Sequence, residues 1–180
     1  MWKKFGLMAL CCCGLAMSAV WGQEPAGELA EKLKVFQPMC GKTFRGEFAN
    51  STPEKPQWDV SKWERAMNGQ AVRVLHSVND GEYGGESIMM WDPSVEKIRF
   101  WYFTTAGFYT TGTLEIDGNK WTSVEKVTGN ANNITEVRST SEVHSDGKMV
   151  TKAEYLHEGK WVPGHEISYQ ESAQSQVKFK

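Results

Sequence analysis

The segment from Tyr102 to Gly112 concentrates side chains that could contact a small molecule. Hydroxyl groups and aromatic rings alternate in it on either side of a central Ala106-Gly107 pair. A binding pocket needs apolar walls with a few placed hydrogen-bonding groups, and this segment supplies both. We therefore expect Tyr102, Thr104 and Thr110 to contact a ligand. The alternative is an ordinary β-hairpin, because Thr and Tyr are favoured in strands.

A second candidate is a pairing of His76 with Glu86. The two residues fall on expected strands joined by a turn at residues 79–81. A His–carboxylate pair inside a cavity can orient a ligand or move a proton, as a small isomerase or hydrolase would require. Two observations weigh against that use. Gly84-Gly85 can mark a bulge that changes the face on which Glu86 lies, and a core His is more often simply hydrogen-bonded.

Tyr155 and His157 complete the set of expected ligand contacts. They share one face of an expected strand over residues 148–157, opposite Lys152 and Glu154. Side chains at alternate positions of a strand lie on the same side of the sheet. If the apolar face is the buried one, both residues point to the interior.

The sequence predicts no metal site and no cofactor. The four His residues are spread over separate expected strands, without a His-x-His, His-Glu-x-x-His or Cys-x-x-Cys spacing, so nothing indicates zinc. There is no Gly-x-Ser-x-Gly nucleophile motif and no phosphate-binding loop. Cys40 is the sole Cys after residue 13; a buried small side chain, an intermolecular thiol and a reactive thiol all remain open for it.

Turn residues recur at short intervals along the chain and define the elements that must position these side chains. Between the turns lie runs rich in Val, Ile, Thr, Tyr, Phe and Trp, the pattern of an antiparallel sandwich or barrel. We predict ten strands, at about residues 41–48, 57–68, 70–78, 82–92, 96–105, 107–116, 120–128, 133–144, 148–157 and 161–170.

The short connections predict that consecutive strands are antiparallel neighbours. Closing such a meander removes its exposed edges, so we predict an all-β, up-and-down barrel, with a two-sheet β-sandwich as the alternative. Leu29, Leu33 and Phe36 recur at helical spacing and predict a short amphipathic helix over residues 28–37. Residues 176–179 either add a last edge strand or fray.

Residues 1–22 have the pattern of a signal peptide. Lys3 and Lys4 precede an apolar run from Phe5 to Val20, and small or β-branched residues precede Gln23. We therefore expect a single β-barrel domain at residues 23–180 in an exported, periplasmic or secreted protein, without a transmembrane span. Lipid attachment at residues 11–13 is less favoured, because a lipid-accepting Cys normally follows a small residue.

The charge balance argues against a nucleic-acid partner. The full chain has a formal net charge of −2, and its Lys and Arg residues form no cluster. A structural role in the cell envelope is a further alternative. Trp101 alternates with Lys97 and Arg99 and is expected on the outside, where exposed aromatic rings could mediate association.

A short helix followed by the segment from Pro38 to Gly46 resembles the first strand of lipocalin-like proteins, with its closely spaced Gly and aromatic residues. The later segments 63–69, 76–77, 83–86, 91–93 and 102–112 look like small exported bacterial barrels of uncharacterised function in the wider calycin group. The resemblance covers about residues 28–170. It implies a barrel whose cavity binds a small apolar or amphipathic molecule without catalysis, and it carries over no catalytic residues.

Haem-binding proteins of this broad architecture use a late His as an iron ligand. The resemblance would place His157 or His165 near that position, but the rest of the pattern of those proteins is not evident in this sequence. The expected assignment therefore remains a barrel without a cofactor.

Overall fold

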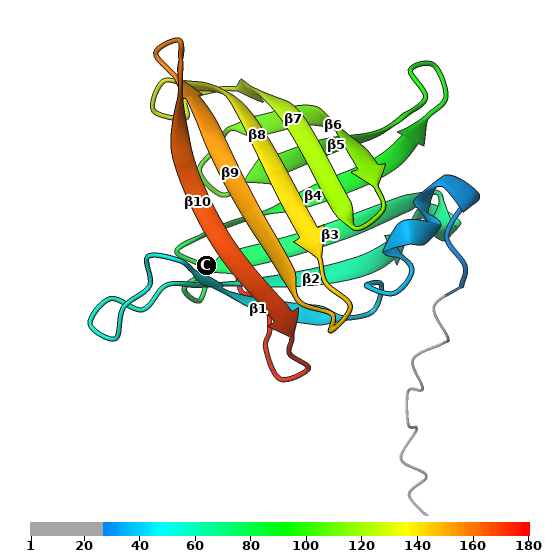
Figure 1. Cartoon of the computed structure of the whole chain (residues 1–180), viewed down its shortest axis with the longest axis horizontal. Coiled ribbons are helices and arrows are strands. Elements are labelled where there is room, and N and C mark those ends of the chain that lie inside the picture. Colours follow the sequence, from blue (N-terminus) through cyan, green and yellow to red (C-terminus); the bar gives the residue numbers. More distant parts are fainter. Residues whose placement is uncertain (1–26) are drawn as a thin grey trace, which may run out of the picture.

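A computed structural model describes residues 27–180, and the expected signal peptide lies outside the described residues. The described chain forms an all-β fold of ten antiparallel strands (Figure 1). They are β1 (Thr43–Phe48), β2 (Trp58–Ala66), β3 (Ala71–Val78), β4 (Tyr83–Asp92), β5 (Lys97–Thr104), β6 (Tyr109–Asp117), β7 (Lys120–Thr128), β8 (Ile134–Val143), β9 (Met149–His157) and β10 (Lys160–Glu171).

The strands close into a barrel. Each strand pairs with its neighbours in the sequence, and β1 pairs with β10, with Phe44 opposite Glu171 and Phe48 opposite Ile167. Every strand therefore has a partner on both sides, which removes the free edges of an open sheet. The predicted up-and-down barrel is confirmed, and the sandwich alternative is wrong.

Alternation along each strand separates the interior from the surface. On β5, Ile98 and Phe100 are buried while Arg99 and Trp101 are exposed, as the sequence predicts for a strand with one wet face. The turn between β3 and β4 holds Asn79, Asp80 and Gly81 at positive φ. Asn, Asp and Gly tolerate that conformation best, so these residues fix where the hairpin turns.

The predicted helix is present as a shorter element, the 3-10 helix η1 (Glu31–Phe36). Leu29, Leu33 and Phe36 are buried as expected. Phe36 packs against two interior rings, with its centroid 5.8 Å from Trp63 and 5.3 Å from Trp121. Six residues are too few for a stable α-helix, and the tighter 3-10 form is common in such short pieces. η1 therefore caps one end of the barrel (Figure 1).

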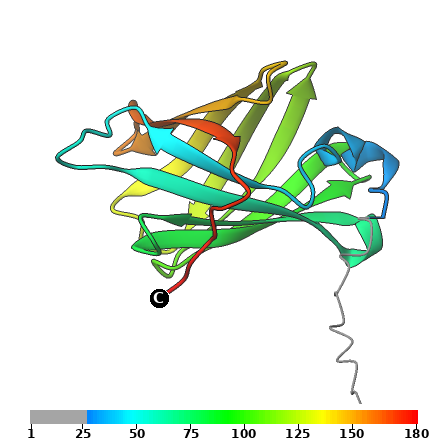
Figure 2. The same cartoon turned by 90° about the horizontal axis from the view of Figure 1, so that it is seen from below.

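The C-terminal segment after β10 lies against the outside of the barrel (Figure 2). The backbone N–H of Lys178 donates to Ser77 Oγ at 3.0 Å, and the Lys178 ammonium contacts Asp80 at 2.8 Å. Ser77 and Val60, which are paired across β3 and β2, are both buried. The segment neither frays nor adds a strand, because a closed barrel offers no edge with which residues 176–179 could pair.

A second 3-10 helix, η2 (Met67–Gly69), links β2 and β3. Cys40 is half-buried against the apolar cluster, and burial raises the pKa of its thiol. Within residues 27–180 no helix has the length and apolar character that crossing a membrane requires.

Candidate functional site

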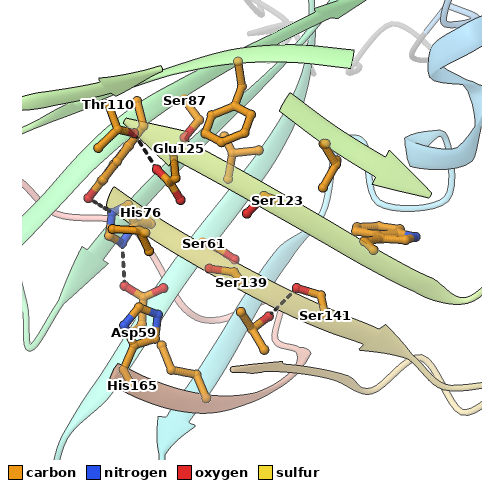
Figure 3. A pocket seen from close by; sticks show the side chains of 18 of the residues that line it. Asp59, Ser61, His76, Ser87, Thr110, Ser123, Glu125, Ser139, Ser141 and His165 are labelled. Carbon is orange, nitrogen blue, oxygen red and sulfur yellow. Dashed lines mark hydrogen bonds and ion pairs between the residues drawn. The ribbon is translucent and has the colours of Figure 1, made fainter. Parts of the chain in front are cut away.

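The barrel encloses a cavity of about 620 Å³, shown in Figure 3. Its base, next to η1, is apolar and is formed by the side chains of Trp63, Met89, Phe100, Trp121 and Met149. We call the opposite end of the barrel, formed by the connections that follow β1, β3, β5, β7 and β9, the far end. The titratable side chains of the cavity lie toward this far end.

Asp59 on β2 is the most deeply buried of these titratable groups, with 1% of its surface exposed. One carboxylate oxygen contacts His76 Nδ1 at 2.8 Å, and the other accepts a hydrogen bond from the Tyr169 hydroxyl at 2.9 Å. A buried carboxylate is costly unless its oxygens find partners. Each oxygen of Asp59 has a partner, so the protein itself supplies the contacts that the buried carboxylate needs.

His76 extends this contact into a chain of four polar side chains. Its Nε2 lies 2.7 Å from the Tyr102 hydroxyl, which donates to the Tyr83 hydroxyl at 2.9 Å. Burial, aided by the neighbouring Tyr83, raises the pKa of Tyr102 well above its usual range, and burial likewise raises the pKa of Tyr83. Both phenols therefore stay protonated, and Tyr102 donates its proton toward Tyr83. The chain joins β2, β3, β4 and β5.

Glu125 on β7 is the second carboxylate of the cavity, and its setting differs from that of Asp59. One of its oxygens accepts a hydrogen bond from the buried Thr110 hydroxyl on β6 (Figure 3). Burial raises the pKa of Glu125, and the bond from Thr110 opposes this shift. Within the described residues, Thr110 is its sole hydrogen-bonding partner. The second oxygen is therefore available to whatever occupies the cavity.

Tyr155 and His165 form a third polar contact near the far end. The Tyr155 hydroxyl lies 2.6 Å from His165 Nδ1, and the Phe48 ring packs edge-on against the imidazole. Burial lowers the pKa of His165, since a cation loses hydration there. His165 is therefore held in its neutral form.

Hydroxyl side chains lie between the apolar base and the titratable groups. Ser141 and Thr151 are hydrogen-bonded to each other at 2.8 Å. Ser61 Oγ and Trp63 Nε1 are buried, and neither has a hydrogen-bonding partner within residues 27–180. The serines that line the cavity are Ser61, Ser87, Ser123, Ser139 and Ser141.

Four of the seven residues predicted from the sequence line this cavity: His76, Tyr102, Thr110 and Tyr155. Glu86, Thr104 and His157 are not among the lining residues. Thr104 uses its hydroxyl inside the hairpin, where it donates to the Phe108 carbonyl at 2.7 Å. His157 is the last residue of β9 and adjoins the turn to β10.

The predicted His76–Glu86 pair is wrong. The register between β3 and β4 runs without a bulge and places Gly85 opposite His76 and Leu75 opposite Glu86. Side chains on successive residues face opposite sides of a sheet, so His76 points inward and Glu86 outward. Glu86 is paired outside the barrel with Arg73, at 2.8 and 3.0 Å.

Five titratable residues that line the cavity are absent from the ligand contacts predicted from the sequence: Asp59, Tyr83, Glu125, His165 and Tyr169. For Asp59 and Glu125, the alternation of inward and outward side chains along the strand could have predicted the inward position. Asp59 shares a face with Ser61 and Trp63, and Glu125 shares one with Trp121 and Ser123. An acidic residue in phase with buried Trp is placed inside the barrel by the period of two alone.

The arrangement can hold a polar group of a ligand, and it can also pass a proton. Asp59 orients the His76 ring, and Tyr102 links that ring to Tyr83, so a proton can move along the chain without large side-chain motion. Among the described residues, no three His, Cys, Asp or Glu side chains are placed to hold one metal ion.

Comparison with known proteins supports the fold and goes no further. No family model matches the chain, and no curated protein sequence matches it. Among solved structures, the crystal structure of Rv2717c from M. tuberculosis superposes with a TM-score of 0.59 and covers 80% of this chain and 99% of that chain. The two sequences are 10% identical, so the similarity is one of fold alone.

Proposed function

We propose that this protein is an exported, lipocalin-like barrel that binds a small apolar or amphipathic molecule without transforming it. The cavity of about 620 Å³ carries the proposal, because ligand-binding pockets typically measure roughly 300–1,000 Å³ and combine apolar walls with a few polar groups. The apolar base beside η1 would receive the body of the ligand. The polar groups toward the far end would receive its polar end.

The polar side chains favour binding over catalysis. Both ring nitrogens of His76 are engaged by protein groups, and Tyr155 engages Nδ1 of His165. Side chains held in this way are pre-organised, which lowers the entropic cost of ordering a site around a ligand. The lipocalin-like assignment rests on the segment from Pro38 to Gly46 together with this architecture.

A small cavity enzyme is the second candidate, and one observation favours it. The contacts from Asp59 through His76 to Tyr102 have the form of an acid–base relay, in which a carboxylate orients an imidazole next to a hydroxyl. Conversion of a bound compound that is lost in His76→Gln would support this candidate over simple binding. A structural envelope role is less favoured, because a barrel that serves only for association needs no cavity, and this one holds about 620 Å³.

Native mass spectrometry of the chain from Gln23 to Lys180, purified from its native host, tests the binding proposal. We expect a bound mass that is released on denaturation. In Ser123→Phe the added ring would fill the cavity and remove this mass. In Val124→Phe the ring would lie outside, because Val124 is 53% exposed, and the mass should remain. An empty protein that also fails to bind fluorescent apolar probes would contradict the proposal.

Export is proposed from the sequence of residues 1–22. Expression of the full chain in its host, followed by N-terminal sequencing, should give a product that begins at Gln23 in the periplasm or the medium. A product that keeps Lys3 and Lys4 in the cytoplasmic fraction would contradict export.

A further inference from the structure

Two acidic residues, Asp59 and Glu125, line the cavity, and no Lys or Arg of residues 27–180 is among the lining residues. The two imidazoles that line it, His76 and His165, already contact Asp59 and Tyr155. A carboxylate taken out of water needs an opposite charge or several hydrogen bonds. The carboxylate that lacks such partners within the protein is the one available to a ligand.

Asp59 is fully engaged by the protein. His76 contacts one of its oxygens and Tyr169 the other, at 2.8 and 2.9 Å. With 1% of its surface exposed, Asp59 presents almost no area to the cavity. It therefore organises the site without contacting the ligand.

Glu125 is not engaged in this way. Thr110 binds one of its oxygens, and within the described chain no group binds the other. The surrounding side chains also suit a cation. Tyr83, Tyr102 and Tyr155 line the same cavity as Glu125, and phenol oxygens and aromatic rings both attract cations.

We propose that Glu125 receives the positively charged end of the ligand, which makes the ligand class an amphipathic amine. This inference rests on the proposed binding function and specifies its ligand. The ammonium would donate to the free Glu125 oxygen, and the opposite charge would restore the ionised carboxylate that burial disfavours. A ligand carboxylate would instead meet two acids and, among the described residues, no Lys or Arg.

The length of the cavity suits an alkyl amine. Trp121, at the apolar base, lies four residues before Glu125 on β7, and at about 3.3 Å per residue this is about 13 Å along the strand. Ser123 is the inward residue between them. The alkyl group of an amine bound at Glu125 can therefore reach the rings of Trp63 and Trp121.

A decyl series separates the charge of the ligand from its apolar body. The probes are decylamine, decanol and decanoate, each titrated into the chain from Gln23 to Lys180 at neutral pH by calorimetry. Fluorescence of Trp63 and Trp121 provides a second readout, since both line the cavity. We expect decylamine to bind at least about tenfold more tightly than decanol, and decanoate to bind most weakly of the three.

Glu125→Gln should remove the preference for the amine while leaving decanol binding within about twofold of wild type. Unchanged decanol binding also shows that the variant is folded. Glu142→Gln is the matched control, because Glu142 is an exposed acid on the neighbouring β8, and it should keep the preference.

The outcomes distinguish this inference from the proposed function. If decanol or decanoate binds as tightly as decylamine, or if Glu125→Gln keeps the preference, the assignment of an amine is overturned while the binding function stands. If none of the three probes binds, the binding function itself fails and the assignment fails with it.

Discussion

Gly85 on β4 lies directly beneath the ring of Tyr102 on β5. A Cβ atom at Gly85 would collide with that ring and with the Phe103 carbonyl oxygen. The missing side chain lets Tyr102 lie close against the barrel wall, where its hydroxyl reaches both His76 and Tyr83. Gly46 has the same relationship to the ring of Tyr169 on β10. Glycine at these positions thus makes room for the aromatic residues of the polar chain.

Gly85→Ala should destabilise the protein by about 2 kcal/mol, because an added carbon in a packed interior forces neighbouring groups to move. Since the ring of Tyr102 must shift, binding to the cavity should weaken as well. Urea unfolding measures the first effect and calorimetry the second. Ser87→Ala, on the same strand and also lining the cavity, is the control and should change stability little. Equal stability of Gly85→Ala and wild type would show that the wall can expand.

Asp59→Asn should cost about 2–3 kcal/mol of unfolding free energy. The amide offers one acceptor where the carboxylate offers two, so His76 or Tyr169 loses its partner inside the barrel. Tyr169→Phe leaves the second oxygen of the buried Asp59 carboxylate without its donor, so it should also cost about 2–3 kcal/mol.

A double-mutant cycle between Asp59→Asn and Tyr169→Phe, measured by denaturant unfolding, checks that account. Residues in direct contact should show an interaction energy of at least about 0.5 kcal/mol. Strict additivity would mean that the bond between them contributes nothing to stability.

Glu125 should make the empty protein less stable as pH rises. Burial raises its pKa in the folded state above the usual value of 4.5. Below 4.5 the carboxyl is protonated in both states and costs nothing. Above 4.5 the unfolded chain ionises first, so stability falls until pH passes the folded pKa, at up to about 1.4 kcal/mol per pH unit.

Glu125→Gln removes this dependence, so the variant should be more stable than wild type at neutral pH and should match it near pH 4. Unfolding free energies compared across pH 4 to 8 give the difference directly. Glu142→Gln should follow wild type throughout, because Glu142 is exposed. A variant less stable than wild type at neutral pH would show that the Glu125 carboxylate is favourably paired.

The barrel could be predicted because the residues that specify each strand and turn are close together in the sequence. Turn residues and period-two alternation recur in every segment, and the closed meander is the arrangement that pairs all of the resulting edges. The inward positions of His76 and Tyr102 followed from the same alternation. η1 was harder, because helical spacing identifies the buried face of Leu33 and Phe36 but does not separate a 3-10 turn from an α-helix.

The composition of the site could be predicted only in part, because it depends on contacts between distant segments. Asp59 and Tyr169 are 110 residues apart in the sequence and meet only because β1 closes the barrel between β2 and β10. The face of Glu86 could not be predicted for a different reason, because a bulge at Gly84-Gly85 would change it. The structure keeps the register there, and Gly85 instead accommodates the ring of Tyr102.

The contact between Ser77 and the C-terminal segment provides the last test. Ser77→Ala leaves the Lys178 N–H without its acceptor in a half-buried setting, so it should destabilise the protein by about 1 kcal/mol in denaturant unfolding. Ser61→Ala is the matched variant, because Ser61 Oγ is also buried but has no hydrogen-bonding partner in the described chain. Removing an unpaired buried hydroxyl should leave stability unchanged or raise it. If both variants lose the same amount, the cost comes from lost packing at small buried side chains, and the bond to Lys178 does not hold the C-terminal segment against the barrel.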